Sequence, residues 1–381
     1  MNSTDLYNWA PALRVMGMGL LLALGPLCWI ALRHRQSHTA ARLRALTVLT
    51  LFLTFDLILF GAFTRLTDSG LGCPDWPGCY GSVTPLGAKT AIEEAQTAMP
   101  TGPVTHGKAW IEMIHRYLAT AVGVLILTLT AFSWSRSVEG ARPWWASVTL
   151  LWVCLQGAFG ALTVTLKLLP AIVTLHLLGG LGLLTLLTVQ AVRMSTAAPH
   201  MMHRRLRQAV GCVTALVWLQ IALGAWVSTN YAVLACQGFP QCNGQWWPAW
   251  DGTGFEWWRE LGHAANGEVL AFSALVSIHM VHRTVAMLVV LAVAVLAWRL
   301  KAARVLPLQT RCLIGLIVLQ VCTGLSNVIL GWPLFAAVLH TGGAAGLVGV
   351  LAWSLTGSRS VADNSVSLHA ELQRADPRPF A

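Results

Sequence analysis

Long apolar stretches recur from one end of this chain to the other, and they constrain its fold more than any other feature. Each is about as long as the roughly 20 residues that an α-helix needs to cross a bilayer. Hydrophobic residues make up 56% of the 381 residues and charged residues only 10%, whereas a soluble domain carries about a quarter charged residues. The sequence therefore predicts an all-α polytopic membrane protein. We expect about nine spans, near residues 12–32, 45–64, 113–134, 146–166, 172–192, 209–229, 278–298, 309–330 and 334–356.

The basic residues predict the orientation of the chain in the membrane. They lie between the spans rather than in one patch, so the formal net charge of +10 does not indicate a nucleic-acid partner. Loops rich in Arg and Lys face the cytoplasm, which places the N-terminus outside and the C-terminus inside. No basic segment precedes the first apolar stretch, so we expect no cleaved signal peptide. The basic loops contain Arg33, Arg35, Arg42, Arg44, Arg136, Arg142, Arg193, Arg204, Arg205, Arg207, Arg299, Lys301, Arg304 and Arg311, and the opposite loops contain Asp68, Asp75, Glu93, Glu94, Asp251, Glu256, Glu260 and Glu268.

An internal repeat divides the spans into two halves of four helices. A repeat of this kind typically builds a pseudo-symmetric bundle with a site inside each half. The recurring spacings are twelve residues from Gly61-Ala62 to Cys73 and from Gly224-Ala225 to Cys236, and twenty residues from Gln156 to His176 and from Gln320 to His340.

The repeat also suggests a division into domains. We expect an additional N-terminal helix with a basic cytoplasmic loop at 1–44, a first four-helix half at 45–200, a second half at 201–356 and a disordered cytoplasmic tail at 357–381.

Four histidines lie a few residues inside spans that begin on the outer side: His115, His176, His282 and His340. The helical rise puts each within roughly 5–10 Å of the outer boundary. An imidazole inside a membrane needs a partner or a function. Two facing helices with one imidazole each can bind the iron of a haem from both sides. The alternative for each histidine is a hydrogen-bonded structural role.

One acidic residue distinguishes the two halves. Glu112 lies one helical turn before His115 and shares its face of the helix, whereas His279 stands at the equivalent place before His282. The alternative for Glu112, His115 and Arg116 together is an interfacial cluster that anchors the end of a helix.

The loop cysteines form a second repeated pattern. Cys73 and Cys79 are separated by five residues, as are Cys236 and Cys242, and both pairs lie in outer loops. In an oxidising compartment such pairs favour disulfides. A metal site or a redox-active dithiol is the competing interpretation, although this is not a usual zinc spacing.

Together these residues resemble the haem A synthase family of cytochrome oxidase assembly. The resemblance covers about residues 45–354. It depends on residues 64–79, TRLTDSGLGCPDWPGC, on Glu112, His115 and Arg116, and on the other three histidines. Members usually have eight spans, so the stretch at 12–32 is a departure from the family.

The resemblance implies an activity and a role for each histidine pair. The family oxidises a porphyrin methyl group of haem O to a formyl group, which gives haem A. This implies that substrate haem O binds between His115 and His176, and that a permanent haem b binds between His282 and His340. Glu112 matches the acidic residue of the family.

A mechanism follows as a hypothesis. Glu112 would act as a general base or stabilise a developing cation, and two successive hydroxylations would give a geminal diol that loses water. Arg65, Arg116 and Arg283 are candidates for pairing with haem propionates, and the alternative for each is a side chain that snorkels to the interface.

Two other functional classes fit parts of the sequence. One is a di-haem electron-transfer subunit, and the other is a haem-handling cytochrome c assembly protein, suggested by the tryptophan-rich stretch at 245–251. For the main interpretation, the expected partners are the lipid bilayer of a bacterial inner membrane, haem O, a haem O synthase and an electron donor or acceptor protein. A homo-oligomer is compatible with the sequence, and His106, His263 and His279 are left without a role.

Overall fold

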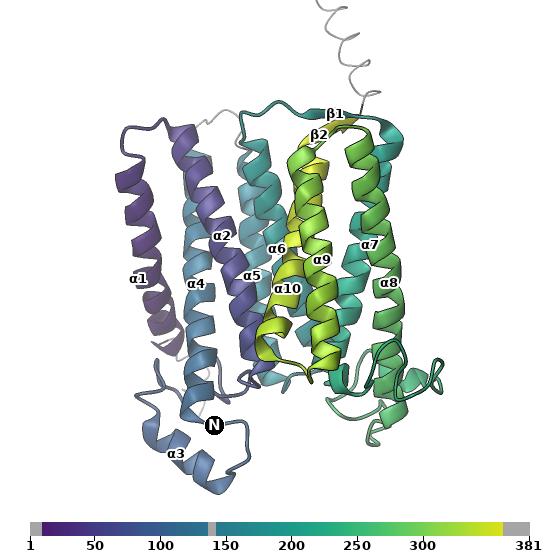
Figure 1. Ribbon diagram of the computed structural model, residues 1–381. Helices are drawn as coiled ribbons and strands as arrows, with labels where there is room; N and C mark the ends of the chain where they lie inside the picture. Colours follow the sequence, from purple (N-terminus) through teal and green to yellow (C-terminus); the bar gives the residue numbers. More distant parts are fainter. Residues whose placement is uncertain (1–9, 136–141, 361–381) are drawn as a thin grey trace, which may run out of the picture.

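The computed structural model describes residues 10–135 and 142–360. Within them, nine helices are long and apolar enough to cross a membrane, which confirms the predicted class and number of spans. Figure 1 shows them side by side as one bundle. They are α1 (Ala10–Arg33), α2 (Thr39–Leu66), α4 (His106–Ser135), α5 (Pro143–Thr165), α6 (Pro170–Arg193), α7 (Arg204–Thr229), α8 (Phe272–Ala302), α9 (Pro307–Ile329) and α10 (Leu334–Thr356).

Local sequence explains where several of these helices begin. Pro143, Pro170 and Pro307 each occupy the first position of a helix, where the fixed φ of proline suits the helix and its missing N–H costs no hydrogen bond. Eight of the nine helices begin before their predicted apolar stretch, and α2 at Thr39, α4 at His106 and α8 at Phe272 do so by the most. The residues added to α2 and α4 include Arg42, Arg44, Lys108 and Glu112, which hydropathy does not assign to a span.

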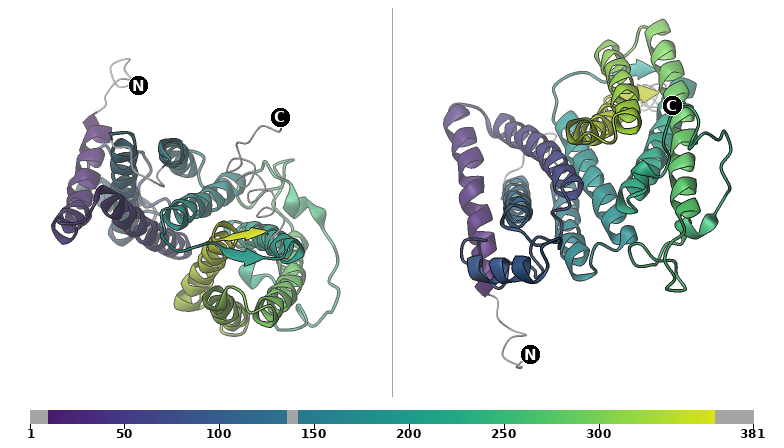
Figure 2. Two further views of the ribbon diagram at one scale, coloured as in Figure 1. Left: turned by 90° about the horizontal axis from the view of Figure 1, so that it is seen from above. Right: turned by 60° about the horizontal axis from the view of Figure 1, so that its bottom comes forward.

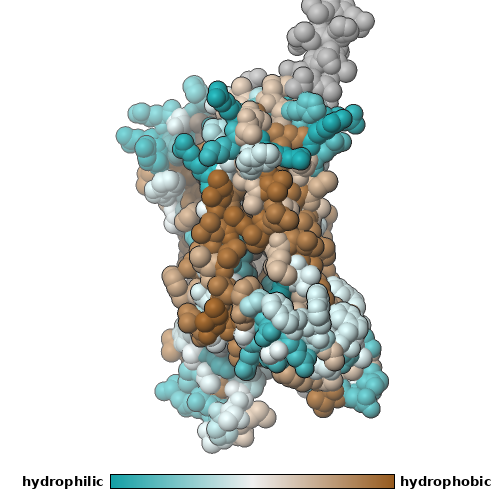
Figure 3. Space-filling view, turned by 45° about the vertical axis from the view of Figure 1, so that its right-hand side comes forward, coloured by the Kyte–Doolittle hydropathy of each residue, from teal (hydrophilic) through white to brown (hydrophobic). Residues whose placement is uncertain are grey.

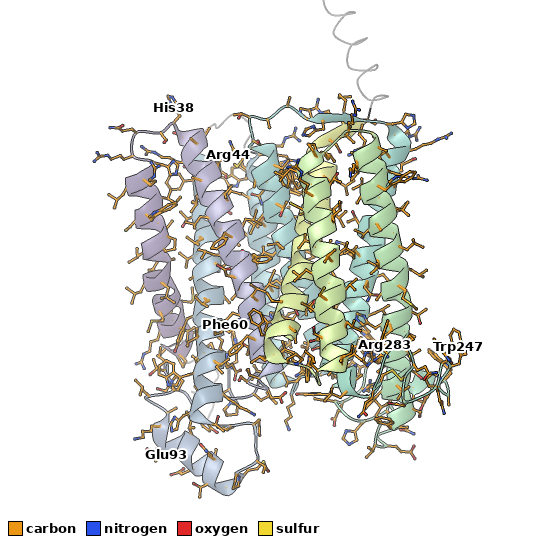
Figure 4. The ribbon with its side chains drawn as sticks, viewed as in Figure 1. His38, Arg44, Phe60, Glu93, Trp247 and Arg283 are labelled. Atoms are coloured by element: carbon orange, nitrogen blue, oxygen red, sulfur yellow. A yellow bond between two sulfur atoms is a disulfide. The ribbon has the colours of Figure 1, made fainter. Side chains whose placement is uncertain are left out.

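The two ends of the bundle differ in chemistry. Figure 4 places His38 and Arg44 at one end, and Glu93 and Trp247 at the other. We call the first the basic end and the second the loop end, because the long connections at 67–105 and 230–271 lie there. Figure 3 shows a hydrophobic band between two hydrophilic ends, as expected of a chain that spans a bilayer.

Contacts between helices form two groups of four. α2, α4, α5 and α6 pack together as the first half, and α7, α8, α9 and α10 pack together as the second half. α6 contacts both α7 and α10, and α2 contacts α10, so these helices form the boundary between the halves. Leu181, Leu184 and Ala345 are buried there.

α1 packs mainly against α4 at the edge of the first half, and Figure 2 shows it far from the second half. The two helices approach closely at Gly19, because a Cβ atom at this position would lie 2.4 Å from Thr120. The additional span is therefore a neighbour of the helix that carries Glu112 and His115.

Backbone conformation repeats between the halves. Asp68 and Tyr231 have φ of 51° and 54°, and Tyr80 and Asn243 have φ of 48° and 52°. The members of each pair lie 163 positions apart (231 − 68 and 243 − 80). Residues with a side chain rarely adopt this left-handed conformation, so its recurrence shows that the two long connections at the loop end form equivalent turns.

Short elements complete the chain. The loop end carries α3 (Lys89–Ala98) and the single-turn helices η2 (Ala232–Leu234) and η3 (Gly252–Phe255). At the basic end, β1 (His200–Met202) pairs in parallel with β2 (Ser358–Ser360). The tail predicted to be disordered from residue 357 is therefore ordered through Ser360. Arg136 and residues 361–381 lie outside the described residues.

Candidate functional site

Each of the four histidines packs against a glycine on the preceding span. A Cβ atom built on that glycine would lie close to Cε1 of the imidazole, in ordinary contact at Gly160 and too close at the other three positions, where the ring would have to shift. The four pairs and these distances are Gly61 and His115 at 3.0 Å, Gly160 and His176 at 3.4 Å, Gly224 and His282 at 2.9 Å, and Gly324 and His340 at 3.1 Å. The same helix-to-helix contact is thus built four times.

The structure brings the histidines together in the two predicted pairs. The imidazoles of His115 and His176 lie close enough to interact electrostatically, as do those of His282 and His340. Phe60, labelled in Figure 4, lies parallel to the His115 ring, with centroids 6.2 Å apart and an interplanar angle of 9°. The first pair therefore lies among α2, α4, α5 and α6.

Hydrogen bonding to the rings differs between the halves. In the second half, the Gln220 amide nitrogen lies 2.9 Å from Nδ1 of His282, and the Thr323 hydroxyl lies 3.0 Å from Nδ1 of His340. In the first half, the buried Nδ1 atoms of His115 and His176 have no hydrogen-bond partner among the described residues.

The sequence explains this difference. Leu57 aligns with Gln220, and Phe159 aligns with Thr323, so the first half lacks both polar side chains. A hydrogen bond to one ring nitrogen fixes the orientation in which the other nitrogen binds a metal. The rings of the second pair therefore have side-chain partners at Nδ1 that the rings of the first pair lack.

These pairs fit a haem better than a bare metal ion. Among residues 10–135 and 142–360, no group of three or more His, Cys, Asp or Glu side chains gathers as a set of metal ligands. Two imidazoles suffice for a haem, because the porphyrin supplies the remaining four ligands and the protein the two axial ones. The unpartnered Nδ1 of His115 and the glycine contacts fit the same interpretation.

Glu112 connects the first histidine helix to the first disulfide loop. Its side chain is buried, with only 4% of the residue exposed. One carboxylate oxygen accepts a hydrogen bond from the backbone N–H of Cys73 at 2.8 Å, and the other accepts from Arg116 at 2.6 Å. In the second half the buried residue at this place is His279, so the carboxylate contact has no copy there.

The arginine that follows each helix-opening histidine binds a disulfide loop. Arg116 donates to the carbonyl oxygens of Asp75 at 2.9 Å and Gly78 at 2.6 Å. Arg283 donates to those of Gly238 at 2.9 Å and Cys236 at 2.6 Å. Both guanidinium groups thus have protein partners, and their predicted pairing with propionates stays a prediction.

The cysteines pair as predicted. Cys73 is bonded to Cys79 and Cys236 to Cys242. All four are buried, and each loop is held by the arginine described above. Each disulfide loop therefore lies at the loop end next to the helix that carries the first histidine of its half.

Arg65 has a different environment, at the boundary between the halves. It donates to the carbonyl oxygen of Ser228 at 2.5 Å and lies 3.3 Å from Asp68. Its guanidinium carbon is 4.0 Å from the centre of the Tyr231 ring. The Tyr231 hydroxyl donates to Asp68 at 2.6 Å. Like Arg116, this arginine already contacts protein groups.

Three histidines had no role predicted from the sequence. His106 begins α4 and lies 3.7 Å from Glu93. The carbonyl oxygen of His263 accepts from Arg259. These two contribute to contacts at the loop end, whereas His279 is buried beside His282 and Arg283.

Sequence reasoning missed Phe60, Gln220 and Thr323. A residue-by-residue alignment of the two halves identifies Gln220 and Thr323, because each replaces an apolar residue of the first half. No comparable signal marks Phe60, since an aromatic residue in an apolar span is ordinary.

Comparison with known proteins places the chain in a family. A family model described as "Cytochrome oxidase assembly protein" matches residues 44–352. The protein "Heme A synthase" of Shewanella oneidensis is 38% identical over 302 residues, which cover 78% of this chain and 91% of the relative. Proteins of the same name from Halalkalibacterium halodurans and a Caulobacter species are 27% and 29% identical, and they cover 74% and 77% of this chain and 86% and 89% of their own lengths. The match begins after α1, and it confirms the resemblance drawn from the residues: this chain belongs to the cytochrome oxidase assembly protein family.

Proposed function

We propose that this chain is a haem A synthase, which oxidises a porphyrin methyl group of haem O to the formyl group of haem A. The observation that carries the proposal is the duplicated histidine pair with unequal surroundings. Both halves offer two facing imidazoles backed by glycine, but their hydrogen bonding and their acidic residues differ. The names of the relatives support the same activity.

The unequal surroundings suggest which half holds which haem. Gln220 and Thr323 orient the rings of His282 and His340, which suits a cofactor that stays bound. A haem b held there would supply electron transfer to or from the substrate site. His115 and His176 lack such partners, which suits a ligand that must arrive as haem O and leave as haem A.

Of the residues at the first site, Glu112 is the best placed to act as an acid or base, or to stabilise a charge. Its two hydrogen-bond donors, Cys73 N–H and Arg116, hold the carboxylate one helical turn from His115. A carboxylate fixed in this way can accept a proton or stabilise positive charge without first having to reorganise. The disulfide loop packs against Glu112, and only 4% of this residue is exposed.

The reaction stays within simple oxidation chemistry. Two successive hydroxylations of the methyl group give a geminal diol, and loss of one water leaves the aldehyde. Each hydroxylation adds one oxygen atom and oxidises the methyl carbon by two electrons, so the reaction needs an oxygen source and an electron-transfer partner outside this chain. We propose an electron donor or acceptor protein as that partner and a haem O synthase as the supplier of the substrate, both in a bacterial inner membrane. In this proposal the loop end faces outward and the basic end faces the cytoplasm, in accord with its arginines.

Haem extraction from the purified protein tests the proposal. The protein is produced with a haem O synthase, and its non-covalently bound haems are extracted and weighed by mass spectrometry. We expect haem b together with haem O and its oxidised products, including the formyl haem. Haem b alone, even after reconstitution with haem O and reductant, would contradict the proposal and favour an electron-transfer subunit.

A further inference from the structure

A carboxyl group lies in the middle of α2. Asp56 is ten residues from the end of this helix at Leu66, which places it about 15 Å below the loop end at the helical rise of 1.5 Å per residue. The residue is half-buried, and within residues 10–135 and 142–360 its carboxyl group makes no hydrogen bond or ion pair with protein. An ionisable group at this depth is costly and usually serves a site.

Asp56 lies on α2, the helix that contacts His115 of the first pair. Phe60 is one helical turn further along α2, so both side chains project from nearly the same side of the helix. The Phe60 ring is parallel to that of His115, and the next residue, Gly61, contacts the same imidazole. Asp56 is therefore about one turn deeper in the membrane than the His115 ring, on the side marked by Phe60.

The second half provides an internal comparison. Leu219 lies 163 positions after Asp56 (219 − 56), the same interval that separates Gly61 from Gly224. Leu219 is 52% exposed on the outside of the bundle, so this position in the repeat lies at an edge that faces lipid. The carboxyl group thus occurs beside the pair proposed to bind substrate and is replaced by leucine beside the pair proposed to bind haem b.

The chemistry of the two haems matches this difference. Haem O carries a hydroxyl-bearing farnesyl chain where haem b carries a vinyl group. The long apolar chain favours lipid, whereas the hydroxyl at its root needs a hydrogen-bond partner in the membrane. A side chain at the lipid-facing edge of the bundle, one turn below the ring ligand, suits that hydroxyl.

We propose that the carboxyl group of Asp56 hydrogen-bonds the hydroxyl of the farnesyl chain and thereby selects haem O over haem b at the first histidine pair. The inference rests on the proposed function. It assigns Asp56 to substrate recognition and leaves the oxidation step to other groups.

Competitive haem binding tests the inference without measuring turnover. The purified protein, with its second pair filled by haem b, is titrated with haem O and separately with haem b, and binding at the first pair is followed by absorbance. The variants are Asp56→Leu, which installs the residue of the second half, and Asp56→Asn, which keeps a hydrogen-bonding side chain. Leu219→Ala is the matched control at the equivalent lipid-facing position.

We expect Asp56→Leu to weaken haem O binding about tenfold, the effect of one lost hydrogen bond, and to leave haem b binding at the first pair unchanged. Asp56→Asn should keep most of the preference, and Leu219→Ala all of it. An equal loss for both haems, or no loss, overturns the inference. If Asp56→Leu does not fold, the inference is judged from the ratio of haem O affinity to haem b affinity in the unchanged protein and in Asp56→Asn. The absence of any preference for haem O in the unchanged protein also overturns the inference. Failure of the unchanged protein to bind either haem at the first pair would instead contradict the proposed function.

Discussion

Arg65 and Ser228 occupy equivalent positions in the two halves, 163 residues apart (228 − 65), and they contact each other directly. Asp68 and Tyr231 are related in the same way and are also hydrogen-bonded. These contacts therefore lie where the two halves meet at the pseudo-symmetry axis. Burial raises the pKa of Tyr231, and Asp68 raises it further while Arg65 opposes the rise, so the hydroxyl stays protonated at neutral pH and can donate to Asp68.

Arg65→Ala should therefore destabilise the protein. It removes a charged hydrogen bond and a cation–π contact between the halves, which together contribute about 2 kcal/mol. The measurement is unfolding in detergent, with Lys89→Ala as the control, because the exposed pair of Lys89 and Glu93 should contribute less than about 0.5 kcal/mol. Equal stability of the Arg65 variant and the unchanged protein would show that this contact does not hold the halves together.

Glu112→Gln should separate haem binding from oxidation. The amide keeps an oxygen that can accept from Cys73 N–H but loses the negative charge, so both haems should still bind while formyl product falls more than about tenfold. Glu112→Ala is a less selective change, because it removes both acceptor oxygens as well as the charge and leaves buried Arg116 with no acceptor at this position, at a cost of about 3–5 kcal/mol. The products are measured by mass spectrometry. Normal haem A output from Glu112→Gln would remove the carboxylate from the proposed chemistry.

Replacing a histidine of the first pair should have a different effect on haem binding from replacing a histidine of the second pair. His282→Ala or His340→Ala should abolish tightly bound haem b and activity with it, because one axial ligand is lost. His115→Ala or His176→Ala should keep that haem b and impair the binding or conversion of haem O. Haem content and absorbance spectra of each purified variant provide the measurement. Full haem b in His340→Ala would reverse the assignment of the two halves.

The disulfide loops should contribute modestly to stability. Replacing both Cys73 and Cys79 with serine should cost about 2 kcal/mol, since only a short loop is closed, and the Cys236 and Cys242 pair should behave similarly. Unfolding of the variants measures the cost. Alkylation of the folded, non-reduced protein is the complementary experiment, in which labelling of these four thiols would contradict the pairing.

Orientation is open to a labelling experiment. A cysteine introduced at Gly267, at the loop end, should react with a membrane-impermeant reagent added to intact spheroplasts, whereas one at Ser195, at the basic end, should react only after permeabilisation. The control is a parent with its five free cysteines replaced, Cys28, Cys154, Cys212, Cys312 and Cys322. The opposite labelling pattern would invert the topology.

Hydropathy was sufficient to predict the spans, and the recurring spacings of glycine, glutamine, histidine and cysteine were sufficient to predict the repeat. The helix α3 was not predicted, because ten amphipathic residues in a loop carry no signal of membrane-spanning length. Its buried residue, Ile92, packs near the first disulfide, a contact that depends on how the loop folds back.

The sequence predicted the residue types of the candidate site better than it predicted their hydrogen-bond partners. Histidine spacing and the repeat were enough to pair His115 with His176 and His282 with His340. The partners of Arg65, Arg116 and Arg283 could not be predicted, because they are mostly backbone carbonyl oxygens whose positions depend on tertiary structure. Asp56 stands out in the sequence as a charged residue inside an apolar stretch. Its position relative to His115 could not be predicted, because it depends on how α2 packs on α4.

The pairing of β1 with β2 has a consequence for the order of assembly. β1 lies in the connection between the halves, and its partner, Ser358–Ser360, follows the last helix. During synthesis the connection at His200–Met202 therefore remains without its partner strand until Ser358 has left the ribosome. A chain stopped at Gly357 would still contain all nine apolar helices, yet the strand that fastens its second half to the connection would never form.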